Sequence, residues 1–164
     1  MGFDLAFMRL RENGEVLDPD FASLEKFLTS EGLFVKESGF VGCIDENDPQ
    51  RVGSLQIKPG EPGGTSGFLD HASLSNEELN RIFGLCAAAG WLIINPQAYD
   101  PSPLMSVPAR NHDERTMNGL KVRWAFVDSV EELEAALIGD FERFQEFKRS
   151  VVAGPEDDHP PSTM

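Results

Sequence analysis

Side chains capable of acid–base or metal chemistry are few in this chain. Its histidines are His71, His112 and His159. His71 follows Asp70, and His112 is followed by Asp113, so each of these two imidazoles has a carboxylate next to it. Such a pair can transfer a proton or bind a metal ion. None of the three histidines lies in the HExxH or HxE…PCxxC patterns of zinc enzymes, and the sequence predicts neither a metal nor a cofactor.

A pocket is expected where polar residues follow apolar strands, because strand ends and loops often carry functional side chains. Asn95 and Gln97 follow an apolar run, and Arg110 lies in a proline-rich stretch. The residues of this candidate pocket are His71, Asn95, Gln97, Arg110 and His112. If they converged, with Asp113 as a carboxylate partner, they would form the acid–base site of a small enzyme. Histidines exposed in surface loops are the simpler interpretation.

Two other segments resemble ligand-binding loops without completing the pattern. The glycine-rich segment 60–67 follows an expected strand, as phosphate-binding loops do, but it contains Glu61 and no Lys or Arg. A nucleotide-binding loop needs a Lys or Arg side chain to pair with the phosphates, so a flexible surface loop is predicted here. The carboxylates of Asp45, Glu46 and Asp48 lack the glycine and the closing glutamate of a calcium loop.

The charge is strongly acidic and unevenly distributed. Asp and Glu number 28 against 14 Lys and Arg, giving a net charge of -14 and a pI near 4.5. Residues 1–50 and 128–164 each carry a net charge of -7, and residues 51–127 are neutral. Such a field disfavours nucleic acid and anionic membranes as partners and favours a basic protein. If the two acidic segments lie side by side, we expect them to form one binding face; otherwise their charge only promotes solubility.

The location is expected to be the cytoplasm. Cys43 and Cys86 show no CxxC or Cys/His spacing, and both are expected to be buried thiols. The first residues lack the basic segment of a signal peptide. No apolar run approaches the roughly 20 residues that a membrane helix needs.

Hydrophobic spacing predicts an α+β fold with a mixed or mostly antiparallel sheet of about five or six strands and three helices. The first helix is expected to be capped by Asp18, with Pro19 at its first position and Phe21 on its buried face. Ser75 and Glu78 predict a capping box for the second helix. Asp128 or Ser129 is expected to begin the third.

Strands are expected at several apolar segments, some of them short. These segments are residues 3–9, 33–44 (two strands joined by a hairpin turn), 52–58, 91–94, 104–107 (an edge strand) and 121–127. Asn118 and Gly119 predict a turn before the last of them. Residues 1–153 are predicted to form one globular domain, and the acidic tail 154–164 is expected to be disordered.

A helix ending at Gly90 and followed by the run 91–97 (WLIINPQ), together with an opening strand at 2–5 (GFDL), resembles small acidic bacterial proteins. Some of those proteins are immunity proteins encoded beside secreted toxins. The resemblance carries no catalytic motif, and it implies a protein that neutralises a toxin by binding it.

The function predicted from charge and from the lack of a catalytic motif is that of a cytosolic, non-catalytic binding protein. It would be an immunity protein or antitoxin that occludes the active site of a basic toxin. The partner-binding residues are predicted to be Asp45, Glu46, Asp48, Glu131, Glu134, Glu142 and Glu146. The alternatives are the small enzyme with a site near His71 and His112, and a regulatory or structural subunit that homodimerises through its last helix. The protein itself is expected to be a monomer or a homodimer.

Overall fold

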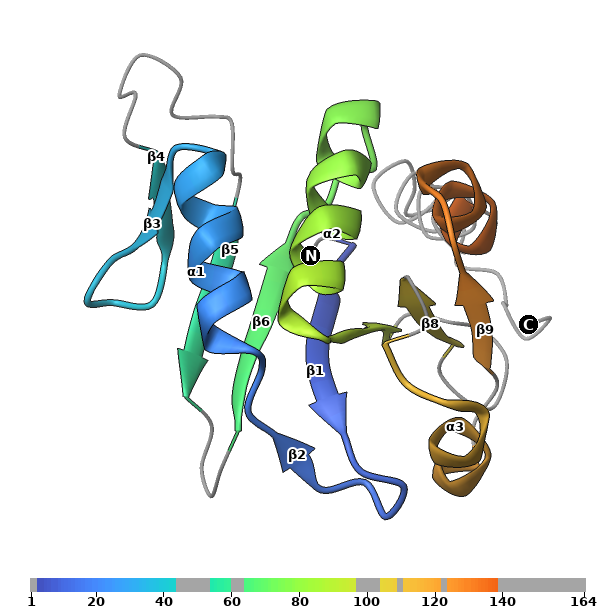
Figure 1. Cartoon of the computed structure of the whole chain (residues 1–164). Helices are drawn as coiled ribbons and strands as arrows, with labels where there is room; N and C mark the ends of the chain where they lie inside the picture. The colour runs from blue at the N-terminus through green and yellow to red at the C-terminus, as the bar shows by residue number, and fades with distance from the viewer. Residues whose placement is uncertain are drawn as a thin grey trace, which may run out of the picture.

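The computed structural model describes most of the chain in six segments, which are residues 3–43, 54–59, 64–96, 104–108, 111–121 and 124–138. Its strands form one seven-stranded sheet and one two-stranded sheet within these segments. The main sheet has the order β5 (Ser54–Pro59), β6 (Thr65–Asp70), β1 (Leu5–Leu10), β7 (Leu92–Asn95), β8 (Leu104–Pro108) and β9 (Trp124–Val127). Figure 1 labels all of these strands except β7. The short strand β2 (Val16–Leu17) pairs with β1. Strands β3 (Leu33–Val35) and β4 (Val41–Cys43) form the separate hairpin.

Three helices lie side by side along one face of the main sheet (Figure 1). They are α1 (Phe21–Ser30), α2 (Asn76–Ala89) and a helix that covers residues 130–138. Their apolar stripes bury one main core against alternate residues of the strands, among them Phe7 and Ile93. Because neighbouring strand residues point to opposite faces, Met8 and Leu92 belong to a second, smaller cluster on the other face. Met117 of α3 (Glu114–Leu120) completes that cluster.

These elements confirm the predicted α+β class. The sheet is mixed, because β8 and β9 pair in parallel while the other pairs are antiparallel. The described residues contain one helix more than predicted, since α3 was not among the three helices expected from the sequence. No helix among the described residues is long and apolar enough to span a membrane.

The start of α2 follows the predicted capping pattern with one difference. Ser75 Oγ accepts a hydrogen bond from the Glu78 N–H at 3.2 Å. Glu78 Oε1 reaches back to the N–H groups of Ser73 and Leu74, at 2.7 and 2.9 Å, instead of that of Ser75. The helix ends at Gly90, which has a left-handed conformation as expected.

Replacing Ser75 with alanine is expected to lower the free energy of unfolding by about 1 kcal/mol, because the Glu78 N–H loses its acceptor at the helix start. Urea denaturation followed by circular dichroism measures this change. Ser30→Ala is the matched control, since Ser30 is an exposed helix-end serine whose hydroxyl donates to the Phe27 carbonyl and caps no N–H group. Equal losses in the two variants would contradict the assigned role of Ser75.

The predicted start of α1 was wrong by two residues. Asp20, not Asp18, is the N-cap, and its Oδ1 accepts from the Ser23 N–H at 3.1 Å. Asp18 instead accepts from the Thr65 N–H at 3.2 Å and ties this segment to β6. Phe21, which was expected on the buried face, is 52% exposed at the first helical position.

Part of the predicted glycine loop is a strand. Residues 65–67 begin β6, an interior strand that pairs with both β5 and β1. Gly67 leaves room there for two rings, because a Cβ atom would lie 3.0 Å from the Trp91 ring and 3.1 Å from the Phe7 ring, closer than an ordinary van der Waals contact. The glycine that suggested a loop therefore makes room for two aromatic side chains of the core.

Two predictions for the second half of the chain were also wrong. Residues 104–107 were expected to form an edge strand, but β8 is internal, between β7 and β9. Asn118 and Gly119 were expected to form a turn, but they belong to the last turn of α3. A Cβ atom on Gly119 would lie 3.0 Å from the Glu12 carbonyl oxygen, so glycine lets this helix approach the β1–β2 turn closely. The predicted tail 154–164 lies outside the described residues.

Candidate functional site

The structure does not bring the two candidate histidines together. The His71 N–H donates to Asp4 Oδ1, just before β1 begins, whereas His112 Nε2 accepts from the Leu10 N–H at the last residue of β1. Six residues of extended strand separate these ends by roughly 20 Å. The acid–base site that would join the two histidines is therefore not formed.

Asn95, another residue of the predicted pocket, does not join His112 either. Asn95 is fully buried at the end of β7. Because β7 runs antiparallel to β1, with Ile94 opposite Ala6, Asn95 lies toward the end of β1 that holds Asp4. Gln97 and Arg110 lie outside the described residues.

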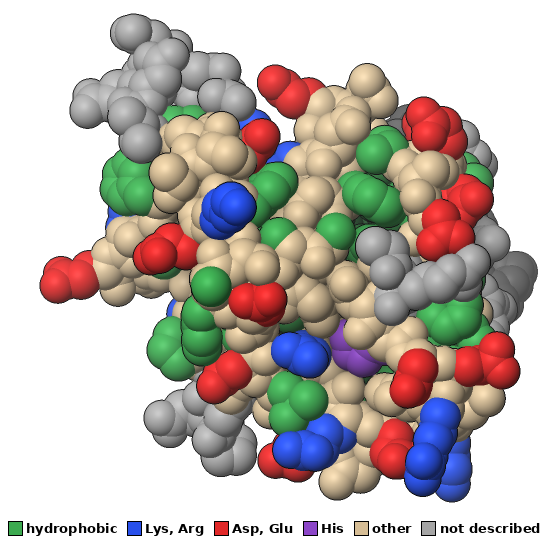
Figure 2. Space-filling view, viewed as in Figure 1, with side chains coloured by type: hydrophobic (Ala, Val, Ile, Leu, Met, Phe, Trp, Pro, Cys, Tyr) green, Lys and Arg blue, Asp and Glu red, His purple; other side chains and the backbone are tan. Residues whose placement is uncertain are grey.

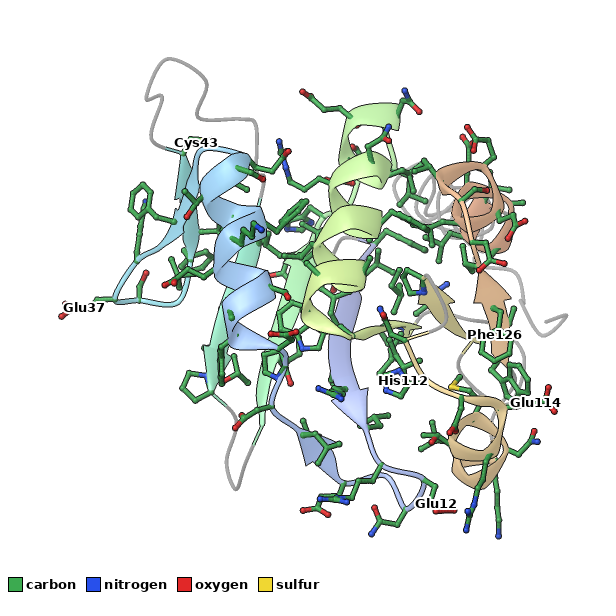
Figure 3. The ribbon with its side chains drawn as sticks, in the orientation of Figure 1. Glu12, Glu37, Cys43, His112, Glu114 and Phe126 are labelled. Atoms are coloured by element: carbon green, nitrogen blue, oxygen red, sulfur yellow. The ribbon has the colours of Figure 1, made fainter. Side chains whose placement is uncertain are left out.

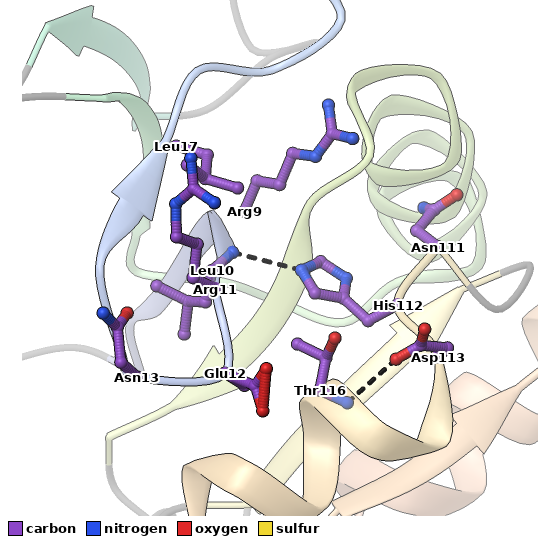
Figure 4. A pocket seen from close by; sticks show the side chains of 10 residues that line it. All are labelled: Arg9, Leu10, Arg11, Glu12, Asn13, Leu17, Asn111, His112, Asp113 and Thr116. Carbon is purple, nitrogen blue, oxygen red and sulfur yellow. Dashed lines mark hydrogen bonds between the residues drawn. The ribbon is translucent and has the colours of Figure 1, made fainter.

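His112 lines a separate cavity, the His112 pocket, of about 450 Å³ (Figure 4). One wall is the end of β1 with the turn that follows it, and the other is the start of α3. The residues that line the pocket are Arg9, Leu10, Arg11, Glu12, Asn13, Leu17, Asn111, His112, Asp113 and Thr116. Two hydrogen bonds fix its walls: the Leu10 N–H donates to His112 Nε2 at 3.1 Å, and Asn111 Nδ2 donates to the Cys86 carbonyl at 2.8 Å.

The His112 ring is held in its neutral form. Burial, and to a lesser extent the positive charge of Arg9, lower its pKa from 6.5 to about 4, and Asp113 opposes both effects. Since Nε2 accepts a hydrogen bond, the proton of the neutral ring is on Nδ1. That nitrogen is buried, and no described residue accepts its hydrogen bond. At neutral pH the ring is therefore a structural acceptor for the end of β1.

Most other charges around the pocket are already engaged within the protein. Arg11 Nε lies 3.1 Å from Glu15, and Arg115 lies 3.8 Å from Glu12. The Asp113 carboxylate caps α3 by accepting from the Thr116 N–H at 2.8 Å, which lowers the pKa of Asp113. Arg9 is exposed and forms no ion pair with a described carboxylate.

A second surface feature is apolar and lies at the other side of the molecule. All four large hydrophobic residues that are exposed in the described segments belong to α1 and the β3–β4 hairpin. They are Phe21 at 52%, Phe34 at 43%, Val35 at 41% and Phe40 at 43%. We call these four residues the apolar patch. Figure 3 shows Glu37, in the turn of this hairpin, on the opposite side from His112.

The geometry of the hairpin explains why these side chains are exposed. Val35 pairs with Val41 and Phe34 pairs with Gly42, so the alternation of side chains places Phe34 and Phe40 together on the outer face. Phe21 and Val35, with Phe34 at its rim, line a groove of about 650 Å³ between α1, the hairpin and β5. The buried residues Leu24, Leu28 and Leu33 form its floor.

The acidic residues within the described part of the two acidic segments do not gather on one face. Glu131 and Glu134 are exposed on the helix 130–138, but α2 separates that helix from α1 (Figure 1). Figure 2 shows acidic side chains spread over this side of the molecule with Lys and Arg side chains between them. The other predicted contact residues, Asp45, Glu46, Asp48, Glu142 and Glu146, lie outside the described residues.

Thiol and metal chemistry find no support in the described segments. Burial raises the pKa of the Cys86 thiol well above its usual value, which keeps it protonated and unreactive. Cys43 is half-buried, and neither cysteine forms a disulfide. Within these segments no three His, Cys, Asp or Glu side chains cluster in a way that could bind a metal ion.

Comparison with family models, curated proteins and solved structures finds no match to this chain. Its function therefore has to be argued from its own residues. Sequence reasoning identified His112 but missed Arg9 and the apolar patch. The available signal for the patch was Phe34 and Phe40, which flank the predicted hairpin turn on the same face.

Proposed function

We propose that this protein is a non-catalytic binding protein that recognises another protein through the apolar patch. The observation that carries the proposal is the exposure of four large hydrophobic side chains on two neighbouring elements: Phe34 and Phe40 on the outer face of the hairpin, and Phe21 and Val35 at the groove beside it. Single exposed hydrophobic residues are common, but several large ones gathered on one surface are typical of protein interaction sites. Aromatic side chains also supply much of the binding energy at such sites.

The packing of the patch favours a rigid contact surface. Leu33 and Val41 anchor the hairpin in the main core, and the Ile57 N–H donates to the Gly39 carbonyl at 2.8 Å. Phe34 and Phe40 are thus fixed on an ordered backbone and need little reorganisation to bind. An interface of this kind loses less conformational entropy on association than one built on a flexible loop.

The charge of the chain favours a basic partner. At a net charge of -14 the protein attracts cationic surfaces over long distances and accelerates their association. A toxin that acts on nucleic acid is basic around its active site, so an immunity protein or antitoxin is the class of binding protein that we propose. In this proposal the apolar patch provides affinity, while the carboxylates, Glu131 and Glu134 among them, provide attraction.

Binding to the product of the adjoining open reading frame tests this function, with the affinity measured by calorimetry. Phe34→Ala is expected to weaken binding by about 30-fold. This factor corresponds to about 2 kcal/mol of binding free energy, a typical loss when an aromatic residue that contributes strongly to an interface is truncated. The double variant F34A/F40A is expected to weaken it further. Unfolding should change little in both variants, because these side chains are exposed.

The matched control is Phe126→Ala, since Phe126 contacts Trp124 with a ring-centroid distance of 5.0 Å on β9, away from the hairpin. This variant is expected to bind with unchanged affinity. If a bound partner proved insensitive to F34A/F40A, the proposed surface would be wrong. A solution mass of two chains that F34A/F40A converts to one would show instead that the patch is a homodimer interface.

A further inference from the structure

Arg9 lies at the edge of the His112 pocket, and no described carboxylate forms an ion pair with it. It lies on β1, and its side chain is 3.9 Å from the position that a Cβ atom on Gly90 would occupy. Arg11 and Arg115, the neighbouring arginines, each have a glutamate partner. Arg9 has none among the described residues, so its guanidinium remains available to a ligand.

Glu12 also lines the pocket, and its carboxylate lies 3.8 Å from Arg115. Two further carboxylates, one near Arg9 and one in the pocket lining, are committed to helix ends. The two carboxylate oxygens of Asp20 accept hydrogen bonds from the N–H and the hydroxyl group of Ser23, at 3.1 and 3.0 Å. These bonds lower the pKa of Asp20, and the positive charge of Arg9 lowers it as well. Asp113 accepts from the Thr116 N–H. Asp20 and Asp113 therefore make their hydrogen bonds to the first turn of a helix, and neither forms an ion pair with Arg9.

The walls of the His112 pocket are fixed before any ligand arrives. His112 holds the Leu10 N–H, which lies between Arg9 and Arg11, and Asn111 is held by the Cys86 carbonyl. The side chains of Leu10 and Leu17 give one wall an apolar surface. At about 450 Å³ the cavity falls within the range of pockets that bind small molecules.

We propose that the His112 pocket binds a small molecule with an oxyanion group, a carboxylate or a phosphate, that pairs with the guanidinium of Arg9. The planar fork of arginine suits such a group because it can donate two parallel hydrogen bonds to its oxygens. The neutral His112 ring acts as a positioning residue that fixes the strand end carrying Arg9. The pocket shares no lining residue with the groove at the apolar patch, so this site is independent of the proposed protein interface.

Titrations of the ¹⁵N-labelled protein with inorganic phosphate and with acetate, at pH 7 and constant ionic strength, test the proposal by NMR. Saturable shifts are expected for the backbone amides of residues 9–13 and 111–113. Arg9→Met is expected to weaken binding of the effective anion by about tenfold or more, because it removes a charge-assisted hydrogen-bonding group. Arg9→Lys keeps the positive charge but lacks the planar guanidinium. Its affinity for the anion is expected to lie between those of the wild type and Arg9→Met.

Lys36→Met is the matched control, since it removes an exposed cation near the hairpin turn and is expected to leave the affinity within about twofold. The two probes distinguish a carboxylate site from a phosphate site. The proposal is overturned if sodium chloride alone reproduces the shifts, if neither anion saturates, or if Arg9→Met binds as tightly as Lys36→Met. These outcomes do not depend on whether a protein partner binds the apolar patch.

Discussion

Replacing Trp91 with alanine is expected to lower the free energy of unfolding by roughly 4 kcal/mol, the upper part of the range for large-to-small substitutions in a core. Trp91 is the largest fully buried side chain of the described segments. Its ring stacks on that of Phe7 with a centroid distance of 6.3 Å and an interplanar angle of 15°. Both rings lie against Gly67, so alanine would leave a cavity bounded by three strands that pair in one sheet and cannot close it easily.

The matched control for this prediction is Trp91→Phe. Phenylalanine keeps an aromatic ring beside Phe7 and removes the buried Trp91 Nε1–H, for which no described residue supplies an acceptor. The loss of packing volume and the removal of this unsatisfied donor act in opposite directions, so the expected cost is below about 1.5 kcal/mol. Urea denaturation followed by circular dichroism measures both variants. Equal costs would show that the ring itself contributes little to the core.

The elements that the sequence predicted correctly are those with local signals. Ser75, Glu78 and Gly90 mark the ends of α2 through hydrogen bonds and backbone conformations that involve only neighbouring residues. Ser129 and Glu132 do the same for the helix 130–138, where Ser129 Oγ accepts from the Glu132 N–H and Glu132 Oε1 accepts from the Asp128 N–H. Short-range patterns of this kind can be read without knowing the tertiary fold.

The elements that were missed depend on distant contacts. Gly67 suggests a loop until the rings of Phe7 and Trp91 are placed beside it. The interior position of β8 follows from pairing with β7 and β9, which no local pattern encodes. In α3 the apolar residue Met117 is fully buried, but the helix has only seven residues, too few for a clear hydrophobic period.

The candidate sites show the same division. His112 was identified by residue type, but its expected partner His71 lies at the other end of β1. The residue that gives the pocket its available charge, Arg9, occupies an ordinary strand position, and only the pairing of its neighbours with glutamates distinguishes it. Exposure of Phe21 likewise depends on where α1 meets the hairpin, because its spacing from Leu24 and Leu28 predicts burial.

Stability is expected to fall as the pH is lowered from 6.5 toward 4 because of His112. The folded-state pKa of this ring is about 4, against 6.5 for an ordinary histidine. Above pH 6.5 the ring is neutral in both states and contributes no pH dependence. Between these two pKa values the histidine is protonated in the unfolded chain but neutral in the folded protein, so acid favours unfolding. The lost free energy is roughly 2 kcal/mol at pH 5 and approaches roughly 3 kcal/mol near pH 4.

The measurement is the free energy of unfolding at pH 7 and at pH 5 for the wild type and for His112→Gln. The glutamine Oε1 can still accept from the Leu10 N–H but does not titrate, so this variant should lack the roughly 2 kcal/mol fall attributed to the ring. Comparison stops at pH 5 because the lowered pKa values of Asp20 and Asp113 make their carboxylates contribute in stronger acid. In His71→Gln, which changes an exposed histidine, the free energy of unfolding is expected to decrease between pH 7 and pH 5 as much as in the wild type. If the free energy of unfolding of His112→Gln decreased as much as that of the wild type, the acid destabilisation would come from groups other than His112.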